Sequence, residues 1–434
     1  MGNDFVPREP EIEFYIETDK DLAGSAGDLI RHEPIGDGDG AFVPGASAVY
    51  RVLYQSTSGT KARLGEPIAV SGLVAFPAGR APAGGWPVVS WAHGTVGSAD
   101  KCAPSMDEYV GVKPGDEGLG LLRKINKAPH KLLSALLNAG WAVAMSDYEG
   151  LGTRGNHPYL LGESEGRGVL DIVAAARHLA VQTDRPSLSE RYSIVGHSQG
   201  GQAALFAAHL ATRSEDRYPT RGLLGGVVAL APASNLAGTL DPLDDPGLRL
   251  AYRNLEVVGD LGAFYPLFSN GVFGGDPDID AREIFQPEAL ANYRRDFDTR
   301  SRAELSQDRF WMKRPPVDAI DPENGIFRAP AMKPGTPRAK AWIAYWKQVD
   351  DFNPARRITV PVRISQALGD QRVKADKTRR LIGRLRDING EQSVTEAYYA
   401  VLAGVPDPVS LGDHFALLVD DGEIQAVVDW LEGL

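Results

Sequence analysis

Short apolar runs alternate with longer amphipathic segments through much of the chain. Several runs have the length and composition of buried strands: 48–55, 68–76, 87–92, 141–146, 192–195 and 227–230. The segments between them carry apolar side chains at helical intervals: 132–139, 169–182 and 199–213. Strands that alternate with helices of this length predict an α/β fold, in which helices cover both faces of a mostly parallel sheet.

The alternation stops near residue 235 and resumes near residue 360. The block between is irregular and rich in aromatic and charged residues, whereas the chain beyond it again reads as strand, helix, strand and helix: 360–367, 374–387, 394–401 and 421–434. The block is therefore predicted to be an insertion into the sheet domain. The expected division is an acidic, glycine-rich extended arm, the first part of the core, the insertion, and the second part of the core: 1–45, 46–234, 235–353 and 354–434.

Composition narrows the possible functions. Of the 434 residues, 43% are hydrophobic, which is enough for a sizeable core, and the net charge of −11 argues against nucleic acid or an anionic membrane as the main partner. The single cysteine, Cys102, excludes an internal disulfide and a cysteine-rich metal site. No H-E-x-x-H or similar cluster is present, so we expect neither metal nor cofactor.

The sequence also bears on location. No run of about 18 apolar residues is present, so no integral membrane segment is expected. The polar start lacks the apolar core of a signal peptide. We therefore expect a cytoplasmic protein, or an extracellular one if a signal peptide was removed before Met1.

A G-x-S-x-G pentapeptide supplies the strongest chemical signal. Gly196-His197-Ser198-Gln199-Gly200 lies between a predicted strand and a predicted helix, which is the context of the nucleophile turn in the α/β-hydrolase fold. Flanking glycines are needed there because a Cβ would clash with neighbouring backbone. Ser198 is accordingly predicted to be the catalytic nucleophile. The alternative, an ordinary glycine-rich turn, is disfavoured by the order of the surrounding elements.

A nucleophilic serine needs a base, normally a histidine held by a carboxylate, and this fold orders them Ser, Asp or Glu, His. His414, between the last predicted strand and helix, is the expected base, since the other downstream histidine, His209, lies in the helix that follows the nucleophile. Asp370 follows the penultimate strand and is the preferred acid. Asp413 is the rival carboxylate.

Two backbone N–H groups should face the carbonyl oxygen as it gains charge. Gln199, directly after the nucleophile, is predicted to supply one. Thr95, in the loop after the strand 87–92, is the first choice for the other, with Gly94 second. The turn at 147–152 should lie on the same rim, where it shapes the pocket or braces the nucleophile turn, or it is a purely structural turn.

Five stretches together carry a family resemblance: GDLIR at 27–31, SWAHGT at 90–95, DYEGLG at 147–152, HPY at 157–159 and GHSQGG at 196–201. Their order and spacing resemble the secretory lipase family of α/β-hydrolases over nearly the whole chain. The resemblance implies a triad of Ser198, Asp370 and His414, and a largely helical lid at the position of the insertion. It also implies that a small-molecule or lipid ester is the substrate.

The predicted function is therefore serine carboxylic-ester hydrolysis, by an esterase or lipase that forms an acyl-enzyme on Ser198. An acyltransferase with the same triad is the first alternative, and a non-catalytic binding protein on this scaffold is the second. Within the insertion, the aromatic cluster Phe264, Tyr265 and Phe268 is the expected substrate contact. Its alternative role is to form the small core of the lid itself.

Overall fold

The computed structural model describes most of the sheet domain and parts of the insertion. The described residues are 10–107, 122, 125–213, 222–235, 264, 267, 270–271, 287–296, 299–307, 357–370, 372–399 and 414–434. In this part of the chain, no helix is long and apolar enough to cross a membrane.

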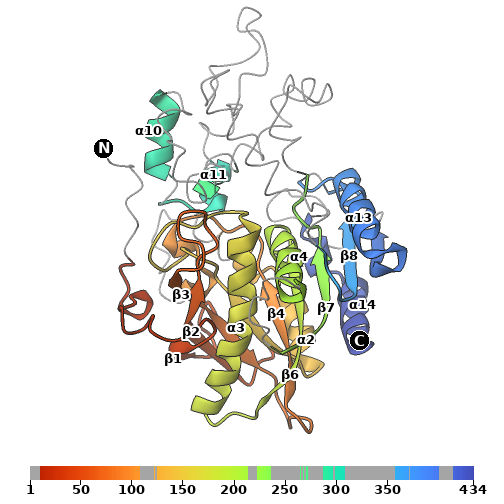
Figure 1. The fold of residues 1–434 in the computed structure, drawn as a ribbon, viewed down its shortest axis with the longest axis horizontal. Coiled ribbons are helices and arrows are strands. Elements are labelled where there is room, and N and C mark those ends of the chain that lie inside the picture. Colours follow the sequence, from red (N-terminus) through yellow and green to blue (C-terminus); the bar gives the residue numbers. More distant parts are fainter. Residues whose placement is uncertain are drawn as a thin grey trace, which may run out of the picture.

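A nine-stranded sheet forms the centre of the described structure (Figure 1). In chain order its strands are β1 (Leu29–Ile35), β2 (Ala48–Thr57), β3 (Pro67–Phe76), β4 (Trp86–Ala92), β5 (Ala142–Ser146), β6 (Leu188–His197), β7 (Leu223–Leu230), β8 (Val362–Ala367) and β9 (Val394–Tyr399). Their order across the sheet is β1-β2-β3-β5-β4-β6-β7-β8-β9. Pairing is antiparallel from β1 to β5 and parallel from β5 to β9. The predicted mostly parallel sheet is thus confirmed.

Helices cover both faces of this sheet. The longer ones are α2 (His130–Asn138), α3 (Gly162–Gln182), α4 (Gln199–Thr212), α13 (Ala375–Asn389) and α14 (Asp421–Glu432). Single turns of 3₁₀-helix are η1 (Glu13–Tyr15), η2 (Asp100–Cys102), η3 (Pro104–Met106), η6 (Glu391–Ser393) and η8 (Ala416–Leu418). One apolar cluster joins the sheet to α3, α4 and α13, and a second joins it to α2, η8 and α14. Neighbouring strand residues such as Val88 and Val89 belong to opposite clusters because side chains alternate along a strand.

The N-terminal arm corrects one expectation. Residues 1–45 were expected to hold little regular structure, yet β1 (Leu29–Ile35) pairs with β2 at the edge of the sheet. The apolar pattern did not predict this strand because its side chains are mostly half-buried and the polar run Arg31, His32 and Glu33 interrupts its apolar residues. Charged side chains and Pro34 are typical of an edge strand, which is held by backbone pairing on one side only.

The insertion at 235–353 lies largely outside the described residues. Its described helices are α10 (Pro287–Asp296) and α11 (Arg302–Gln307). The start of α11 is docked on the loop after β4, because the N–H of Arg302 donates to the Val96 carbonyl at 2.8 Å and Ser301 forms a bridge with Gly97. A salt bridge of 3.1 Å between Lys101 and Glu304 supports the same contact. This part of the insertion thus meets the sheet domain near its predicted site.

Candidate active site

Ser198 occupies a sharp turn between the end of β6 and the first residue of α4. Its backbone has φ 59° and ψ −117°, a conformation that is strained for a residue with a side chain. A Cβ on Gly196 would lie 2.0 Å from the Gly200 carbonyl oxygen, and one on Gly200 would lie 1.9 Å from that of Ala92. Only glycine fits at either position, so the structure contains the strand–turn–helix arrangement that the motif predicted.

The structure brings the three predicted triad residues together. His414 Nε2 lies 3.0 Å from Ser198 Oγ, and His414 Nδ1 lies 2.7 Å from Asp370 Oδ2. Asp370 follows β8, and His414 lies just before η8, so three separate segments contribute. Both Asp370 and His414 are buried, whereas Ser198 is partly exposed to the pocket. The rival acid, Asp413, lies outside the described residues.

Asp370 is held by several donors besides the imidazole. Its Oδ1 accepts hydrogen bonds from the backbone N–H groups of Arg372 at 2.8 Å and Val373 at 3.0 Å. Burial by itself raises the pKa of Asp370, but the charge of His414 and these hydrogen bonds outweigh burial, so the pKa lies below its usual value. An ionised Asp370 can therefore orient His414 and stabilise its protonated form.

A second histidine fixes the loop that carries His414. His197, the residue before the nucleophile, has its Nε2 2.8 Å from the His414 carbonyl oxygen, and the two rings lie 4.6 Å apart. Burial, together with the proximity of His414, lowers the pKa of His197 to about 3. The neutral ring can thus donate an Nε2–H to that carbonyl. Sequence reasoning missed this contact, although the position of His197 inside the G-x-S-x-G motif was available as a signal.

The predicted oxyanion-hole residues lie beside Ser198. Gly94 and Thr95 line the same pocket as the serine, and a Cβ on Gly94 would lie 3.6 Å from Ser198 Cβ. Thr95 Oγ1 lies 2.7 Å from the Tyr159 hydroxyl, which fixes its side chain. Gln199 begins α4, so its N–H is one of those at a helix N-terminus that have no partner within the helix. The structure thus places Gly94 and Thr95 at the pocket beside Ser198, and their role as donors stays a prediction.

The Gln199 side chain is anchored in a buried polar network. Its Nε2 lies 2.7 Å from Glu165 Oε1 and 3.1 Å from His157 Nε2. The other ring nitrogen of His157 lies 3.0 Å from the Glu149 carbonyl oxygen, and the Leu160 N–H donates to Glu165 at 2.9 Å. Burial raises the pKa of Glu165 to about 8, despite these hydrogen bonds. Sequence reasoning missed Glu165 and named His157 only within the HPY stretch of the family resemblance, with no role of its own.

The turn at 147–152 braces the loop that carries Gly94 and Thr95. The Tyr148 hydroxyl donates to the His93 carbonyl at 2.8 Å, and the two rings lie 4.3 Å apart. The His93 Nδ1 lies 2.8 Å from the Gly94 carbonyl oxygen, while burial lowers the pKa of His93 to about 4. Asp147 accepts hydrogen bonds from Ser71 at 2.7 Å and from Ser105. These contacts support the loop that carries Gly94 and Thr95, and the expected roles of the turn at the pocket and at the nucleophile turn stay predictions.

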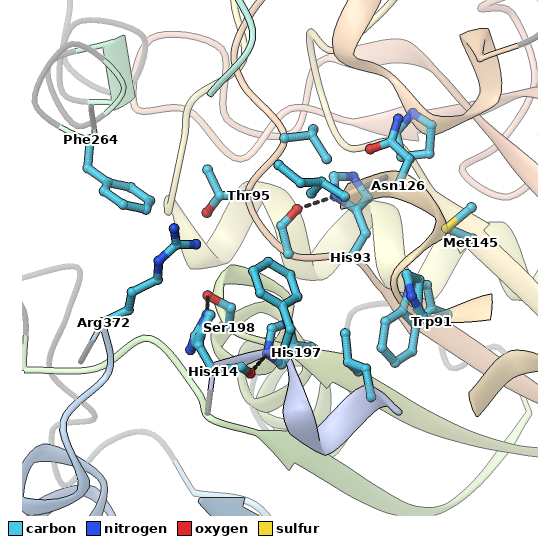
Figure 2. Close-up of a pocket in the computed structure, with 17 residues that line it drawn as sticks. Trp91, His93, Thr95, Asn126, Met145, His197, Ser198, Phe264, Arg372 and His414 are labelled. Atoms are coloured by element: carbon cyan, nitrogen blue, oxygen red, sulfur yellow. Dashed lines mark hydrogen bonds between the residues drawn. The ribbon is translucent and has the colours of Figure 1, made fainter. Parts of the chain in front are cut away.

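A mainly apolar pocket opens over Ser198 and His414 (Figure 2). Its apolar lining comes from several elements: Trp91, Val96, Ile125, Met145, Phe264, Phe415 and Leu418. Phe264, 8% exposed, lines this pocket and its predicted contact with substrate stays a prediction, while Tyr265 and Phe268 lie outside the described residues. Arg372 also lines the pocket and was not predicted. Among the described residues, no group of three or more His, Cys, Asp or Glu side chains could hold a metal ion.

The mostly parallel sheet and the serine turn at its edge give the chain the α/β-hydrolase fold, as predicted. The comparison with family models is more specific, since residues 125–272 match the model of the secretory lipase family. The resemblance that the sequence motifs indicated is thereby confirmed. The match supports an ester hydrolase as the class of protein.

A curated relative is a protein of Mycobacterium tuberculosis (strain CDC 1551 / Oshkosh) named as a probable inactive lipase. The two chains are 28% identical over 226 residues, which is 52% of this chain and 45% of that protein. The chain thus spans less than half of the length of this relative.

Two solved structures share the fold. Candida antarctica lipase A has a TM-score of 0.61 at 18% identity, over 90% of this chain and 80% of that one. The rice cell wall degrading esterase LipA from Xanthomonas oryzae also has a TM-score of 0.61 at 18% identity, over 94% of this chain and 99% of that one. At this level of identity the likeness concerns the fold alone.

Proposed function

We propose that this chain is a serine carboxylic-ester hydrolase, an esterase or lipase that acts through an acyl-enzyme on Ser198. The observation that carries the proposal is the continuous hydrogen-bonded chain from Ser198 to His414, at 3.0 Å, and from His414 to Asp370, at 2.7 Å. A serine hydroxyl is a poor nucleophile at neutral pH unless an adjacent imidazole accepts its proton. The secretory lipase match supports the same class of substrate.

In the first half of the reaction, Ser198 Oγ attacks the ester carbonyl carbon while its proton passes to His414 Nε2. The carbonyl oxygen becomes an oxyanion and is stabilised by the N–H groups of Gln199 and of Thr95, or of Gly94 in its place. Collapse of this intermediate breaks the bond to the alcohol oxygen. The alcohol leaves with the proton from His414, and the acyl group stays on Ser198.

In the second half, a water molecule attacks the acyl-enzyme. His414 accepts a proton from the water, a second oxyanion forms in the same hole, and its collapse returns the proton to Ser198 and releases the carboxylic acid. Attack by an alcohol in place of water would give acyl transfer by the same steps. Throughout, Asp370 holds the imidazole in the tautomer with a proton on Nδ1.

The buried network under Gln199 has a positioning role in this scheme. The side-chain amide of Gln199 is held by Glu165 at 2.7 Å and by His157 at 3.1 Å, and we expect this anchor to restrict movement of the residue that supplies the proposed oxyanion donor. A donor that is fixed before the reaction costs no reorganisation when the oxyanion forms.

The proposal also gives the insertion 235–353 the role of a lid over the site. In the chain it lies between the core segments 46–234 and 354–434. Support comes from Phe264, which lines the pocket, and from Arg302, whose N–H is bonded to the loop after β4. The match to a secretory family supports an extracellular location.

The test is labelling and turnover of the whole protein. Wild type should hydrolyse p-nitrophenyl esters and react with a fluorophosphonate at Ser198 alone. Ser198→Ala should lose the label and about 10⁶-fold in turnover while it keeps its melting temperature. A label on a different serine, or equal turnover by the two proteins, would contradict the proposal.

The name of the mycobacterial relative motivates a second candidate, a non-catalytic protein on the same scaffold. The close contacts within the triad argue against it here, because a scaffold without turnover has no need of an aligned base and nucleophile. Wild-type protein that binds an ester but neither hydrolyses it nor reacts with the fluorophosphonate would favour this candidate.

A further inference from the structure

His197 joins the nucleophile turn to the main chain of the proposed base. It ends β6, directly before Ser198, and it is buried, with 1% of its surface exposed. Its Nε2 lies 2.8 Å from the carbonyl oxygen of His414, although the two residues stand 217 positions apart in the chain. Figure 2 shows this contact beside Ser198. The contact thus acts on the backbone of His414, whereas Asp370 acts on its ring.

The direction of this hydrogen bond follows from the groups involved. A carbonyl oxygen accepts and does not donate, so Nε2 of His197 carries the proton. Burial and the proximity of His414 lower the pKa of His197 to about 3, so its ring is neutral at neutral pH. The acceptor is a backbone carbonyl, which keeps its lone pairs whether the imidazole of His414 is neutral or protonated. The contact can therefore persist through a reaction in which His414 gains and loses a proton.

Three aromatic rings pack together around this contact. The ring centres of His197 and His414 lie 4.6 Å apart, and the ring of Phe415 lies 5.4 Å from each of them. In addition, a Cβ on Gly94 would lie 3.3 Å from His197 Nδ1, so the His197 ring lies against the loop of the proposed oxyanion donors. His197 therefore connects the nucleophile turn with the base and with that loop.

The position of His414 depends on contacts of this kind. His414 belongs to neither a strand nor an α-helix, and it precedes the short turn η8. Its Nε2 lies 3.0 Å from Ser198 Oγ, and the proposed proton transfer requires this distance to be kept. A misplacement of about 1 Å can slow a catalysed reaction about 100-fold. Movement of the His414 backbone would therefore reduce turnover even if Asp370 stayed in place.

From these contacts we infer that His197 is a positioning residue: its Nε2–H holds the backbone of His414 so that the imidazole stays aligned with Ser198 Oγ. The inference rests on the proposed ester hydrolysis and adds to it a residue that transfers no proton itself. The bond has the same role in both halves of the reaction, because His414 accepts a proton from Ser198 in the first and from water in the second. Its loss should therefore lower the rate and leave the binding of the ester unchanged.

The test compares substitutions of His197 that differ in the donor they offer. His197→Leu removes the donor, and kcat on p-nitrophenyl butyrate should fall about 100-fold with little change in KM. His197→Gln should recover most of this loss, since its amide nitrogen stands about as far from the backbone as Nε2 and can donate to the same carbonyl. The amide of His197→Asn stops one methylene short of that carbonyl, so its kcat should stay low. Equal kcat values for the Gln and Asn variants would overturn the inference.

His209→Leu is the matched control. His209 is also a buried histidine, and its Nδ1 lies 3.0 Å from a distant backbone carbonyl, that of Arg357, but it does not line the pocket. The substitution should lower the melting temperature about as much as His197→Leu does, while kcat stays at the wild-type value. Wild-type kcat in His197→Leu would overturn the inference. A change confined to KM would overturn it as well and indicate that His197 acts only as a wall of the pocket.

A spectroscopic measurement separates this inference from the proposed function. The proton between His414 Nδ1 and Asp370 Oδ2, which lie 2.7 Å apart, should give a proton NMR signal at unusually low field, because the bond is short and its acceptor is ionised. The signal should be broadened or lost in His197→Leu and retained in His197→Gln and His209→Leu. That pattern supports the positioning role even if wild type hydrolyses no ester. Turnover that depends on Ser198, together with a signal and a kcat that do not respond to changes at His197, overturns the positioning role and leaves the proposed function in place.

Discussion

Individual residues of the proposed triad depend on one another through two hydrogen bonds. Asp370 keeps a pKa below its usual value only because His414 and two backbone N–H groups oppose the effect of burial. An ionised acceptor on Nδ1 leaves Nε2 free of a proton and directed at Ser198 Oγ. The state of the carboxylate thus determines whether the serine has a base.

The first prediction at this scale concerns Asp370→Asn. The amide is nearly the same size, so the fold should persist, but its NH₂ group favours the wrong imidazole tautomer. Turnover of an ester should fall by very roughly 10⁴-fold, as it does for the same change in the general Ser-His-Asp scheme. Steady-state kinetics on p-nitrophenyl butyrate would measure the loss.

Asp413→Asn is the matched control for this experiment, because Asp413 is adjacent to His414 in the sequence. It should retain most of the activity. If Asp413→Asn is the more damaging of the two changes, the acid has been assigned to the wrong residue.

At the scale of elements, the start of α3 links the stability of the protein to its site. Residues 162–168 precede the apolar repeat and are buried apart from Glu163, and within them Glu165 contacts Gln199 of α4 at 2.7 Å. Burial raises the pKa of Glu165 to about 8. Between its ordinary value, about 4.5, and about 8, the folded protein holds a proton that the unfolded chain has released. Stability therefore falls as the pH rises through this range.

The prediction is that Glu165→Gln removes this dependence. Glutamine can accept the same two hydrogen bonds through its carbonyl oxygen and never ionises. The difference in melting temperature, Glu165→Gln minus wild type, should increase as the pH is raised from about 5 to about 8. Differential scanning calorimetry at a series of pH values would give the difference.

Glu163→Gln provides the control on the same helix, since Glu163 is 27% exposed and forms a salt bridge of 2.8 Å with Arg167. Its difference from wild type should stay flat over this range. A flat difference for Glu165→Gln as well would mean that Glu165 is already ionised in the folded protein at neutral pH.

The elements also show what a sequence can predict. Parallel strands and amphipathic helices have a regular apolar period, so β4 to β8 and α14 were predictable to within a few residues. The start of α3 was missed by seven positions, because buried polar residues such as Glu165 interrupt the period. β1 was missed since an edge strand is held by backbone pairing, which leaves no apolar pattern.

The same distinction between local patterns and distant contacts explains which residues of the site were predicted and which were missed. Ser198, Asp370 and His414 each follow or precede a core element at the same edge of the sheet, so chain order was enough to name them. His197, Glu165 and Arg372 act through contacts with segments distant in the sequence. Such contacts follow from packing in three dimensions, and a single sequence does not encode them in a local pattern.

At the scale of the whole molecule, residues 235–353 are the proposed insertion between two parts of the sheet domain, and Phe264 is the described residue among them that lines the pocket. The Phe264 ring lies 5.5 Å from the Arg302 guanidinium carbon and 5.7 Å from that of Arg372. We expect such contacts between the insertion and the core to determine which acyl chains fit in the pocket.

The prediction is that Phe264→Ala, alone or with Phe268→Ala, changes the preference between short and long esters more than it changes stability. Removal of a ring from the pocket wall enlarges the space for the acyl chain, whereas removal from a core costs about 3–5 kcal/mol. The ratio of kcat/KM for p-nitrophenyl acetate and p-nitrophenyl decanoate, measured beside the melting temperature, separates the two effects.

Phe14→Ala is the control, because the Phe14 ring also lies near a guanidinium, that of Arg51 at 5.6 Å, but does not line the pocket. Its ester ratio should match wild type. An unchanged ratio for Phe264→Ala, together with a large fall in melting temperature, would assign Phe264 to the internal core of the insertion.

The separation of the triad along the chain has a consequence for biosynthesis. His414 stands 216 residues after Ser198, and Asp370 also comes late. A ribosome completes the nucleophile turn well before it adds the base, so the growing polypeptide carries an unactivated serine while most of the sheet already exists. Any product of premature termination before His414 would lack the proposed base and should not hydrolyse esters. Ester hydrolysis should therefore begin, during cell-free translation, only after the segment with His414 has been made. The time at which activity appears would report when the sheet domain is complete.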